Sequence, residues 1–207
     1  MGNYVIAVLL AVCAPWAMAG EQVRELAPFK DISGEGFFKL VVTAGLPQSV
    51  KLVAKDDDLA NVTSTVVGEE LRLSMSKKNK WITDDRVVIT ITVPQLRQFR
   101  MEGVGSVELN QLSGDKFVLN HQGVGSITAR GKVKHFVLRA EGVGTLNAKD
   151  LDAAQVEAWL QGVGSALVRA SESLDAHVEG VGSLTYYGHP AKVTKRADGV
   201  GSVRAGD

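Results

Sequence analysis

The chain has only one cysteine, Cys13, among its 207 residues. Cys13 lies in an apolar N-terminal segment that we expect to be removed, so the mature protein would have no disulfide, thiolate metal site or cysteine nucleophile. The sequence also lacks a net charge, because 23 basic residues balance 23 acidic ones. This balance does not favour nucleic acid or anionic lipid as a partner. Only 5 prolines accompany 22 glycines, which is typical of a β-protein with many tight turns.

The N-terminal segment is typical of a secretory signal peptide. Residues 4–14 are an apolar run, and Ala17-Met18-Ala19 matches the small-x-small pattern that precedes a cleavage site. We therefore expect residues 1–19 to be removed, leaving a mature chain without a transmembrane span in the periplasm, on the cell surface or outside the cell. One alternative is an uncleaved membrane anchor, for which the run is short. Another is a lipoprotein at Cys13, which lacks the small residue needed before the cysteine.

A Gly-Val-Gly unit followed by Ser or Thr recurs six times in the C-terminal half. Successive copies are spaced by 20, 19, 20, 18 and 19 residues. The twelve repeat glycines are Gly103, Gly105, Gly123, Gly125, Gly142, Gly144, Gly162, Gly164, Gly180, Gly182, Gly199 and Gly201. Apolar and polar residues alternate around each copy with the period of a β-strand. One such unit cannot bury its apolar face alone, so we expect the units to stack as rungs about 4.8 Å apart.

The predicted fold is all-β, a right-handed parallel β-helix (solenoid) with coils of about 19 residues. Propeller blades are about twice as long, and the consensus of leucine-rich repeats is absent. We expect one domain over residues 20–207, with six regular coils in 101–205 and a less regular β N-terminal cap in 29–100. The strands expected in this cap cover residues 37–43, 49–54, 71–75 and 87–93. The connections expected between them include Asp56–Asp58 and residues 77–80.

The repeat glycines are interpreted as structural corners, because glycine permits positive φ and close approach between stacked backbones. We expect the valine between each pair of glycines to point inward, so that the six valines form one aliphatic column. The following Ser and Thr hydroxyls are expected to bond backbone groups at the corner. A Gly-x-Gly-Ser run also resembles a phosphate-binding loop, but that loop needs a following helix, and no copy has a helical pattern after it.

Two outward rows of side chains upstream of the glycines form the candidate binding face. One row is acidic or amide, and the row two residues earlier is mainly basic or aromatic. The candidate residues are Arg100, Glu102, Gln122, Arg139, Glu141, Trp159, Gln161, His177, Glu179 and Arg196. A large outward aromatic side chain flanked by arginine and acidic groups is suited to binding a glycan or an envelope protein. The alternative is a solvated face on which opposite charges pair.

No catalytic residue, metal site or cofactor is expected. The four histidines lack zinc-ligand spacing, and His121 falls on an inward row, where a core role is expected. Some parallel β-helices cleave acidic polysaccharides with calcium, and Glu141, Glu179 and Arg139 could be assigned such roles. Carboxylates two coils apart, however, would be separated by about 9.6 Å, too far to share one calcium ion. The six Ser or Thr positions are equivalent, so no catalytic triad can be singled out.

The order of motifs resembles a bacterial family described as putative auto-transporter adhesin head, GIN domain. The motifs are Phe29–Ile32, Val50–Val53, Leu71–Leu73 and Val93–Leu96, followed by the glycine coils. The similarity covers about residues 29–205, although this chain has valine where Gly-Ser-Gly is commoner in the family. The resemblance implies an exported, non-enzymatic, adhesin-like or scaffold protein with a β-solenoid fold, and no catalytic residues carry over. The alternative is a structural protein that self-assembles through its ends or edges.

Overall fold

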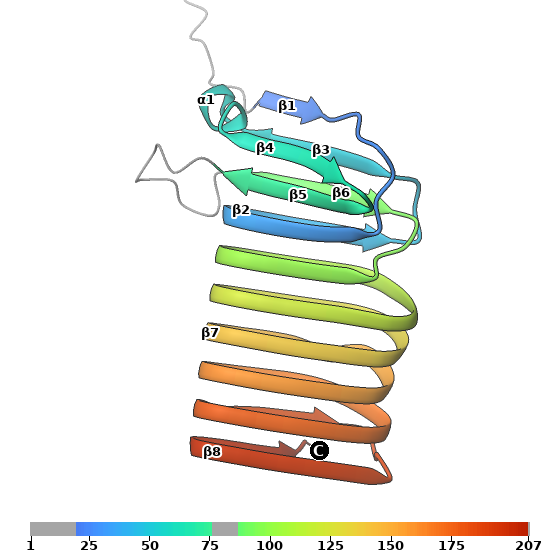
Figure 1. Cartoon of the computed structure of the whole chain (residues 1–207), viewed down its shortest axis with the longest axis vertical. Coiled ribbons are helices and arrows are strands. Elements are labelled where there is room, and N and C mark those ends of the chain that lie inside the picture. The colour runs from blue at the N-terminus through green and yellow to red at the C-terminus, as the bar shows by residue number, and fades with distance from the viewer. Residues whose placement is uncertain (1–19, 76–86, 207) are drawn as a thin grey trace, which may run out of the picture.

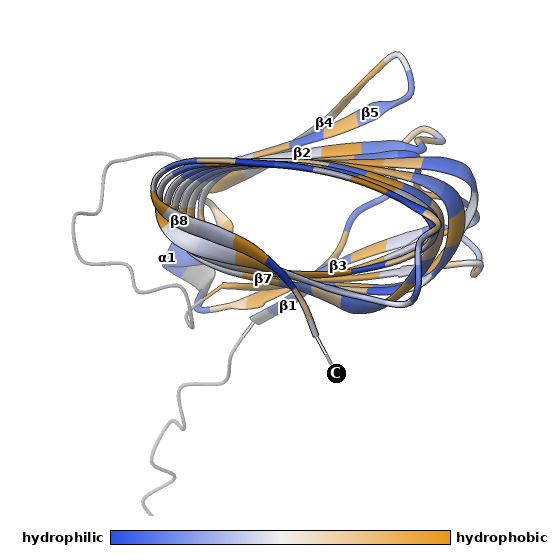
Figure 2. Ribbon diagram, turned by 90° about the horizontal axis from the view of Figure 1, so that it is seen from below, coloured by the Kyte–Doolittle hydropathy of each residue, from blue (hydrophilic) through white to orange (hydrophobic). Residues whose placement is uncertain are grey.

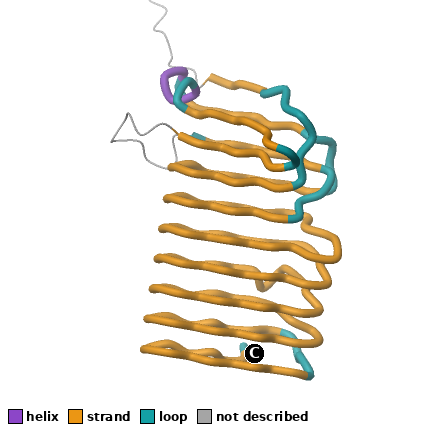
Figure 3. Tube along the Cα trace, viewed as in Figure 1, coloured by secondary structure: helices purple, strands orange, loops and turns teal. Residues whose placement is uncertain are grey.

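The computed structural model describes residues 20–75 and 87–206, most of which lie in β-strands. The elements in chain order are β1 (Gly20–Val23), β2 (Asp31–Ala44), β3 (Ser49–Ala54), α1 (Asp56–Leu59), β4 (Val62–Val67), β5 (Glu70–Met75), β6 (Val88–Val93), β7 (Gln98–Tyr187) and β8 (Lys192–Ala205). Figure 3 shows that the longer loops and the single helical turn gather in the N-terminal part.

The strands expected in the N-terminal third are present as β2, β3, β5 and β6. Asp56–Asp58, which we expected to be a loop, belong instead to the helical turn α1. The predicted signal peptide and the connection at residues 77–80 lie outside the described residues. In the part of the chain that is described, no helix is long and apolar enough to cross a membrane.

The prediction of a right-handed parallel β-helix is wrong, although the fold is all-β. The strands belong to one 8-stranded sheet of mixed direction, which curls as a half-barrel rather than forming a parallel β-helix. Pairing is parallel where β2 meets β5, β6 and β7, and where β7 meets β8. It is antiparallel between β1 and β3, β3 and β6, and β4 and β5. The glycine repeat does not extend into the N-terminal third, where short turns such as Gly68-Glu69 between β4 and β5 reverse the chain.

β7 is one continuous strand of 90 residues that winds repeatedly, so that its successive passes lie side by side (Figure 1). Its first pass pairs with β2, in a register that sets Gly36 opposite Gly103 and Phe37 opposite Val104. Its last pass pairs with β8, setting Val181 opposite Val200. The corner motifs of neighbouring passes are therefore aligned from β2 to β8.

Alternate side chains along the passes point into a single apolar core. Figure 2, seen along the stack, shows the curled sheet around this interior. Phe117 and Phe136 lie in adjacent passes and are almost fully buried. Their rings stack, with centroids 6.0 Å apart and planes inclined by 11°. Aromatic pairs of this kind stabilise a core beyond the area that they bury.

Candidate functional site

The glycine corner brings the backbones of neighbouring passes into direct contact. A Cβ atom added at Gly123 would overlap the carbonyl oxygen of Gly103, and one at Gly142 would overlap that of Gly123. Gly123 and Gly142 also have φ values of 139° and 126°, which side-chain-bearing residues rarely adopt. Both requirements exclude every residue except glycine, so the repeat glycines align the corner from pass to pass.

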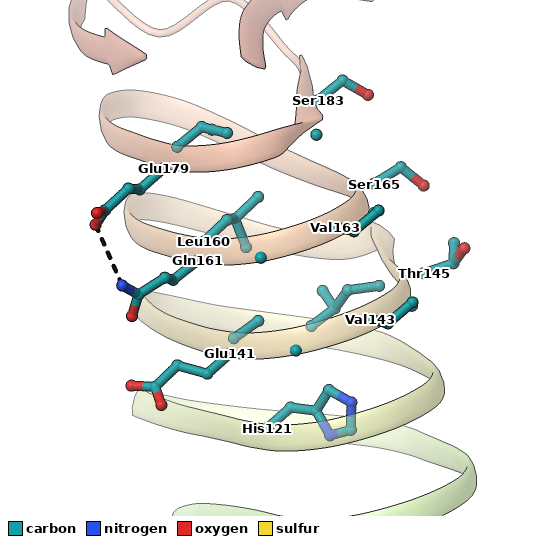
Figure 4. Close-up of a pocket in the computed structure, with 18 residues that line it drawn as sticks. His121, Glu141, Val143, Thr145, Leu160, Gln161, Val163, Ser165, Glu179 and Ser183 are labelled. Atoms are coloured by element: carbon teal, nitrogen blue, oxygen red, sulfur yellow. Dashed lines mark hydrogen bonds between the residues drawn. The ribbon is translucent and has the colours of Figure 1, made fainter. Parts of the chain in front are cut away.

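The valines between these glycines point outward, so the prediction of an inward valine column is wrong. Val143 is 49% exposed, Val163 51% and Val181 53%. We call this row the valine stripe. Its members are Phe37, Val104, Val124, Val143, Val163, Val181 and Val200. Figure 4 shows two of these side chains on the corner. The stripe is a continuous row of apolar side chains on the surface, with members about 4.8 Å apart.

The residue before each repeat glycine belongs to an exposed row that we call the acid–amide column. Its members are Glu102, Gln122, Glu141, Gln161, Glu179 and Asp198. The Gln122 amide donates to the Glu141 carboxylate at 3.2 Å, and the Gln161 amide donates to Glu179 at 3.4 Å (Figure 4). Each amide thus bonds the carboxylate of the next pass, and Gln122 and Gln161 separate the carboxylates of Glu102, Glu141 and Glu179 from one another.

Two residues earlier lies the basic–aromatic column, which is partly stacked. Its members are Arg100, Asn120, Arg139, Trp159, His177 and Arg196. The Arg139 guanidinium carbon lies 4.9 Å from the centroid of the Trp159 ring system. The His177 ring also stacks on Trp159, with centroids 6.3 Å apart and planes inclined by 15°. Since stacked groups from the two neighbouring passes cover the Trp159 ring, little of its faces remains free to contact a ligand.

His177 has one further contact, with Asp175 of the same pass. Its Nε2 atom lies 3.1 Å from Asp175 Oδ1, within ion-pair distance. Asp175 Oδ1 nevertheless has no hydrogen-bond partner among the described residues, so the contact is close enough for an ion pair but is not a hydrogen bond. Asp175 is thus placed to interact with the imidazole ring when the ring is protonated.

A row of hydroxyl side chains follows the glycines and completes the corner. Its members are Ser106, Ser126, Thr145, Ser165, Ser183 and Ser202. We call the four rows together the corner face: the basic–aromatic column, the acid–amide column, the valine stripe and this hydroxyl row. All ten residues of the predicted binding face lie on it, in two adjacent rows. The valine stripe was not predicted from the sequence, although strict alternation from Gln122 through Val124 to Ser126 would have placed Val124 on the outside.

Behind the corner lies a cavity of about 50 Å³, lined partly by His121, Ala140, Leu160 and Val178. Two features leave this space unfilled. The corner glycines have no side chains, and the inward residue that follows His121 in the next pass is the small Ala140. The two ring nitrogens of His121 are buried and have no hydrogen-bond partner within the described part of the chain. Burial lowers the pKa of His121 below its usual value, because it disfavours the charged imidazolium.

His121 is therefore expected to make the fold sensitive to acid. Its pKa is lower in the folded state than in the unfolded state, so the unfolded chain takes up the proton first. Stability should fall as the pH drops below about 6.5, the pKa of an unperturbed histidine. We expect His121→Leu to weaken this dependence and to gain about 1 kcal/mol at neutral pH, by removing buried polar atoms without partners.

Urea denaturation followed by circular dichroism at several pH values would measure this effect. The exposed His189 provides the matched control, since His189→Leu changes the same chemical group outside the cavity. Equal acid sensitivity of His121→Leu and the parent protein would contradict the prediction.

The chemistry available on the corner face is that of contact and hydrogen bonding. Over residues 20–75 and 87–206, no group of three or more His, Cys, Asp or Glu side chains is arranged to hold a metal ion. The face instead repeats a similar set of groups from pass to pass: a stacking or cationic group (Asn120 in one pass), an acid or amide, an apolar side chain and a hydroxyl. Such a pattern suits a long ligand that presents similar groups at regular intervals.

Comparison with known proteins confirms the family resemblance inferred from the sequence. The family described as "Putative auto-transporter adhesin, head GIN domain" matches residues 28–130 and again residues 100–190. No curated protein matches the chain.

Solved structures show the same likeness. A putative adhesin from Bacteroides fragilis is 27% identical, with a TM-score of 0.76 over 92% of this chain and 98% of that one. Putative adhesins from Parabacteroides merdae and Parabacteroides distasonis are 14% and 16% identical, with TM-scores of 0.52 and 0.53. Each of these two alignments covers 92% of this chain, and they cover 97% and 98% of the other chains. At this low identity, the two Parabacteroides proteins show similarity of fold alone.

Proposed function

We propose that this chain, which belongs to the family described as putative auto-transporter adhesin, head GIN domain, is a non-enzymatic adhesin-like module that binds a linear glycan along its corner face. Adhesins act outside the cytoplasm, so membership of the family favours an exported or surface-displayed protein. The predicted signal peptide at residues 1–19 agrees with export.

The observation that carries this proposal is the exposure of the valine stripe. Val124, Val143, Val163 and Val181 occupy four consecutive passes, and each is about half exposed. Single exposed apolar side chains are common, but a continuous row of them marks an interaction surface. The corner glycines hold this row straight, so the surface exists before any ligand binds and little ordering is needed.

A glycan fits the mixture of groups on the corner face. The C–H faces of sugar rings are apolar and can lie on the valine stripe, whereas ring hydroxyls both donate and accept hydrogen bonds. The acid–amide column and the hydroxyl row flank the stripe and offer both donors and acceptors. Trp159 supports the surface by holding Arg139 and His177 in one stack, because these two groups cover the ring faces that a sugar would otherwise contact.

Replacing valines of the stripe by threonine tests this proposal. The triple variant Val143→Thr, Val163→Thr and Val181→Thr keeps the shape and the strand preference of each side chain but adds a hydroxyl. We expect binding to linear polysaccharides, measured on a glycan array and by calorimetry, to weaken about tenfold or more, because apolar contact is lost at three successive positions.

Val23→Thr provides the matched control, because Val23 is 58% exposed in β1 and does not belong to the corner face. This variant should bind like the parent protein. A triple variant with unchanged affinity would contradict the proposal, as would a parent protein that binds no polysaccharide.

A further inference from the structure

We propose that the outer edge of β4 pairs with β4 of a second copy of this chain, giving a weak two-fold dimer. This inference goes beyond glycan binding and depends on different residues. β4 is the last strand of the sheet path β1-β3-β6-β2-β5-β4, and within the described residues it pairs only with β5. Figure 2 shows β4 and β5 extending away from the main body of the sheet, and no described strand pairs with the outer edge of β4.

The composition of β4 differs from that of the other edge strands. Its residues are Val-Thr-Ser-Thr-Val-Val, with no charge, proline or glycine. Proteins usually protect an exposed edge strand with charged residues, proline, bulges or short length. β8 carries four basic residues, Lys192, Lys195, Arg196 and Arg204. β1 is only four residues long and includes Glu21. The edges at β8 and β1 are thus protected in the usual ways, whereas β4 has no charge, proline or glycine and, in the described part of the chain, no strand on its outer side.

A two-fold axis perpendicular to the sheet makes the two β4 strands antiparallel and keeps each face of the sheet continuous. Directly opposed residues must then share a face. With the axis at Thr65, the exposed face brings Thr63 opposite the partner's Val67, and Thr65 opposite its own copy. Side chains of this kind favour cross-strand packing, and no like charges oppose each other.

Arg24 favours this register over one centred on Ser64. Its Nη1 atom donates to Ser64 Oγ at 2.7 Å, so the guanidinium is fixed beside that residue. An axis at Ser64 would bring the two Arg24 groups together across the interface, and their like charges would repel. An axis at Thr65 sets Ser64 opposite Val66 and moves the guanidinium groups apart.

The expected dimer is weak, because β4 has only six residues. Interfaces that bury less than about 1,200 Å² belong to transient complexes. Anchoring at a surface raises the local concentration of the chains, which would then associate more completely than in dilute solution.

Analytical ultracentrifugation of the purified protein, from low-micromolar to millimolar concentration, tests the dimer. We expect a monomer–dimer equilibrium that Thr65→Lys weakens at least tenfold, because the axis would set two lysines directly opposite each other. Thr65→Glu should weaken it similarly, and an equimolar mixture of the two variants should restore association. Thr194→Lys in β8 is the control for the other long edge and should associate like the parent protein.

A parent protein that stays monomeric up to millimolar concentration would overturn the proposal. A dimer that Thr65→Lys leaves intact, or that Thr194→Lys disrupts, would overturn it as well, because the contact would then lie elsewhere. Glycan binding by the monomer is measured separately, so failure of the dimer and failure of the proposed function can be distinguished.

Discussion

Gly123→Ala is expected to destabilise the protein by at least about 4 kcal/mol, a large share of the 5–15 kcal/mol that stabilises a typical domain. The new Cβ would overlap the carbonyl oxygen of Gly103 in the preceding pass. The backbone φ of 139° at Gly123 is also unfavourable for alanine. The strained backbone accounts for about 1–3 kcal/mol. The overlap adds to this, because only a movement of one whole pass relative to the other can relieve it.

Gly68→Ala separates these two contributions. Gly68 has a φ of 64°, but nothing lies within 4 Å of an added Cβ. Only the conformational penalty remains there, about 1–2 kcal/mol. Urea denaturation followed by circular dichroism gives both free energies of unfolding. Equal losses for the two variants would show that contact between passes does not constrain the corner.

Phe117→Ala is the second change with a large expected effect, a loss of about 3–5 kcal/mol. Phe117 is fully buried and stacks on Phe136 of the next pass, so truncation removes this contact and leaves a cavity in the core. The packing around the site is tied to the backbone ladder and can collapse only partly, which keeps the cost high.

Phe37→Ala provides the matched control on the outer side of the sheet. Phe37 is 40% exposed at the first position of the valine stripe. Its truncation should change the free energy of unfolding by no more than about 1 kcal/mol. Thermal and urea denaturation of both variants check the assignment of inner and outer faces. A Phe37→Ala loss as large as that of Phe117→Ala would contradict it.

Strand periodicity in the sequence predicted the all-β class and the inner face of the passes. Residues such as Phe99, Leu109 and Ala129 alternate with polar neighbours, and the structure buries all three. This inference depends only on the two-residue period of a strand, which is local and regular along residues 98–187.

The direction of strand pairing in the N-terminal third could not be predicted in the same way. Pairing there depends on which strands meet after each turn. The sequence of residues 31–93 has no repeat from which the partner of each strand could be predicted. β2, for example, pairs with β5 and β6 on one side and with β7 on the other. The prediction allowed a less regular β cap over residues 29–100, but not one sheet of mixed parallel and antiparallel pairing that curls as a half-barrel. That sheet overturns the parallel β-helix.

The exposed valine stripe was not predicted, because the repeat glycines were expected to bend the strand and the two-residue alternation was not continued through them. Counting from inward His121, the period of two places Gln122 outward, Gly123 inward and Val124 outward. Because the glycines were taken to form a bend, the valine between them was predicted to point into the core. The stacking of Trp159 was also beyond local reasoning, since its partners Arg139 and His177 lie 20 and 18 residues away in the chain.

The alignment of the corner glycines also determines how the protein can change in length. Spacings between copies vary from 18 to 20 residues, yet every motif stays in line with its neighbours. The differences are therefore absorbed between the corners, as where Arg169 contacts Lys149, 20 residues away, and Ser171 contacts Ala153, 18 residues away. Gain or loss of one complete copy would therefore extend or shorten the corner face by one step of about 4.8 Å without disturbing the remaining rows. Gene duplication within the repeat could thus adjust the reach of the surface while leaving its chemistry unchanged.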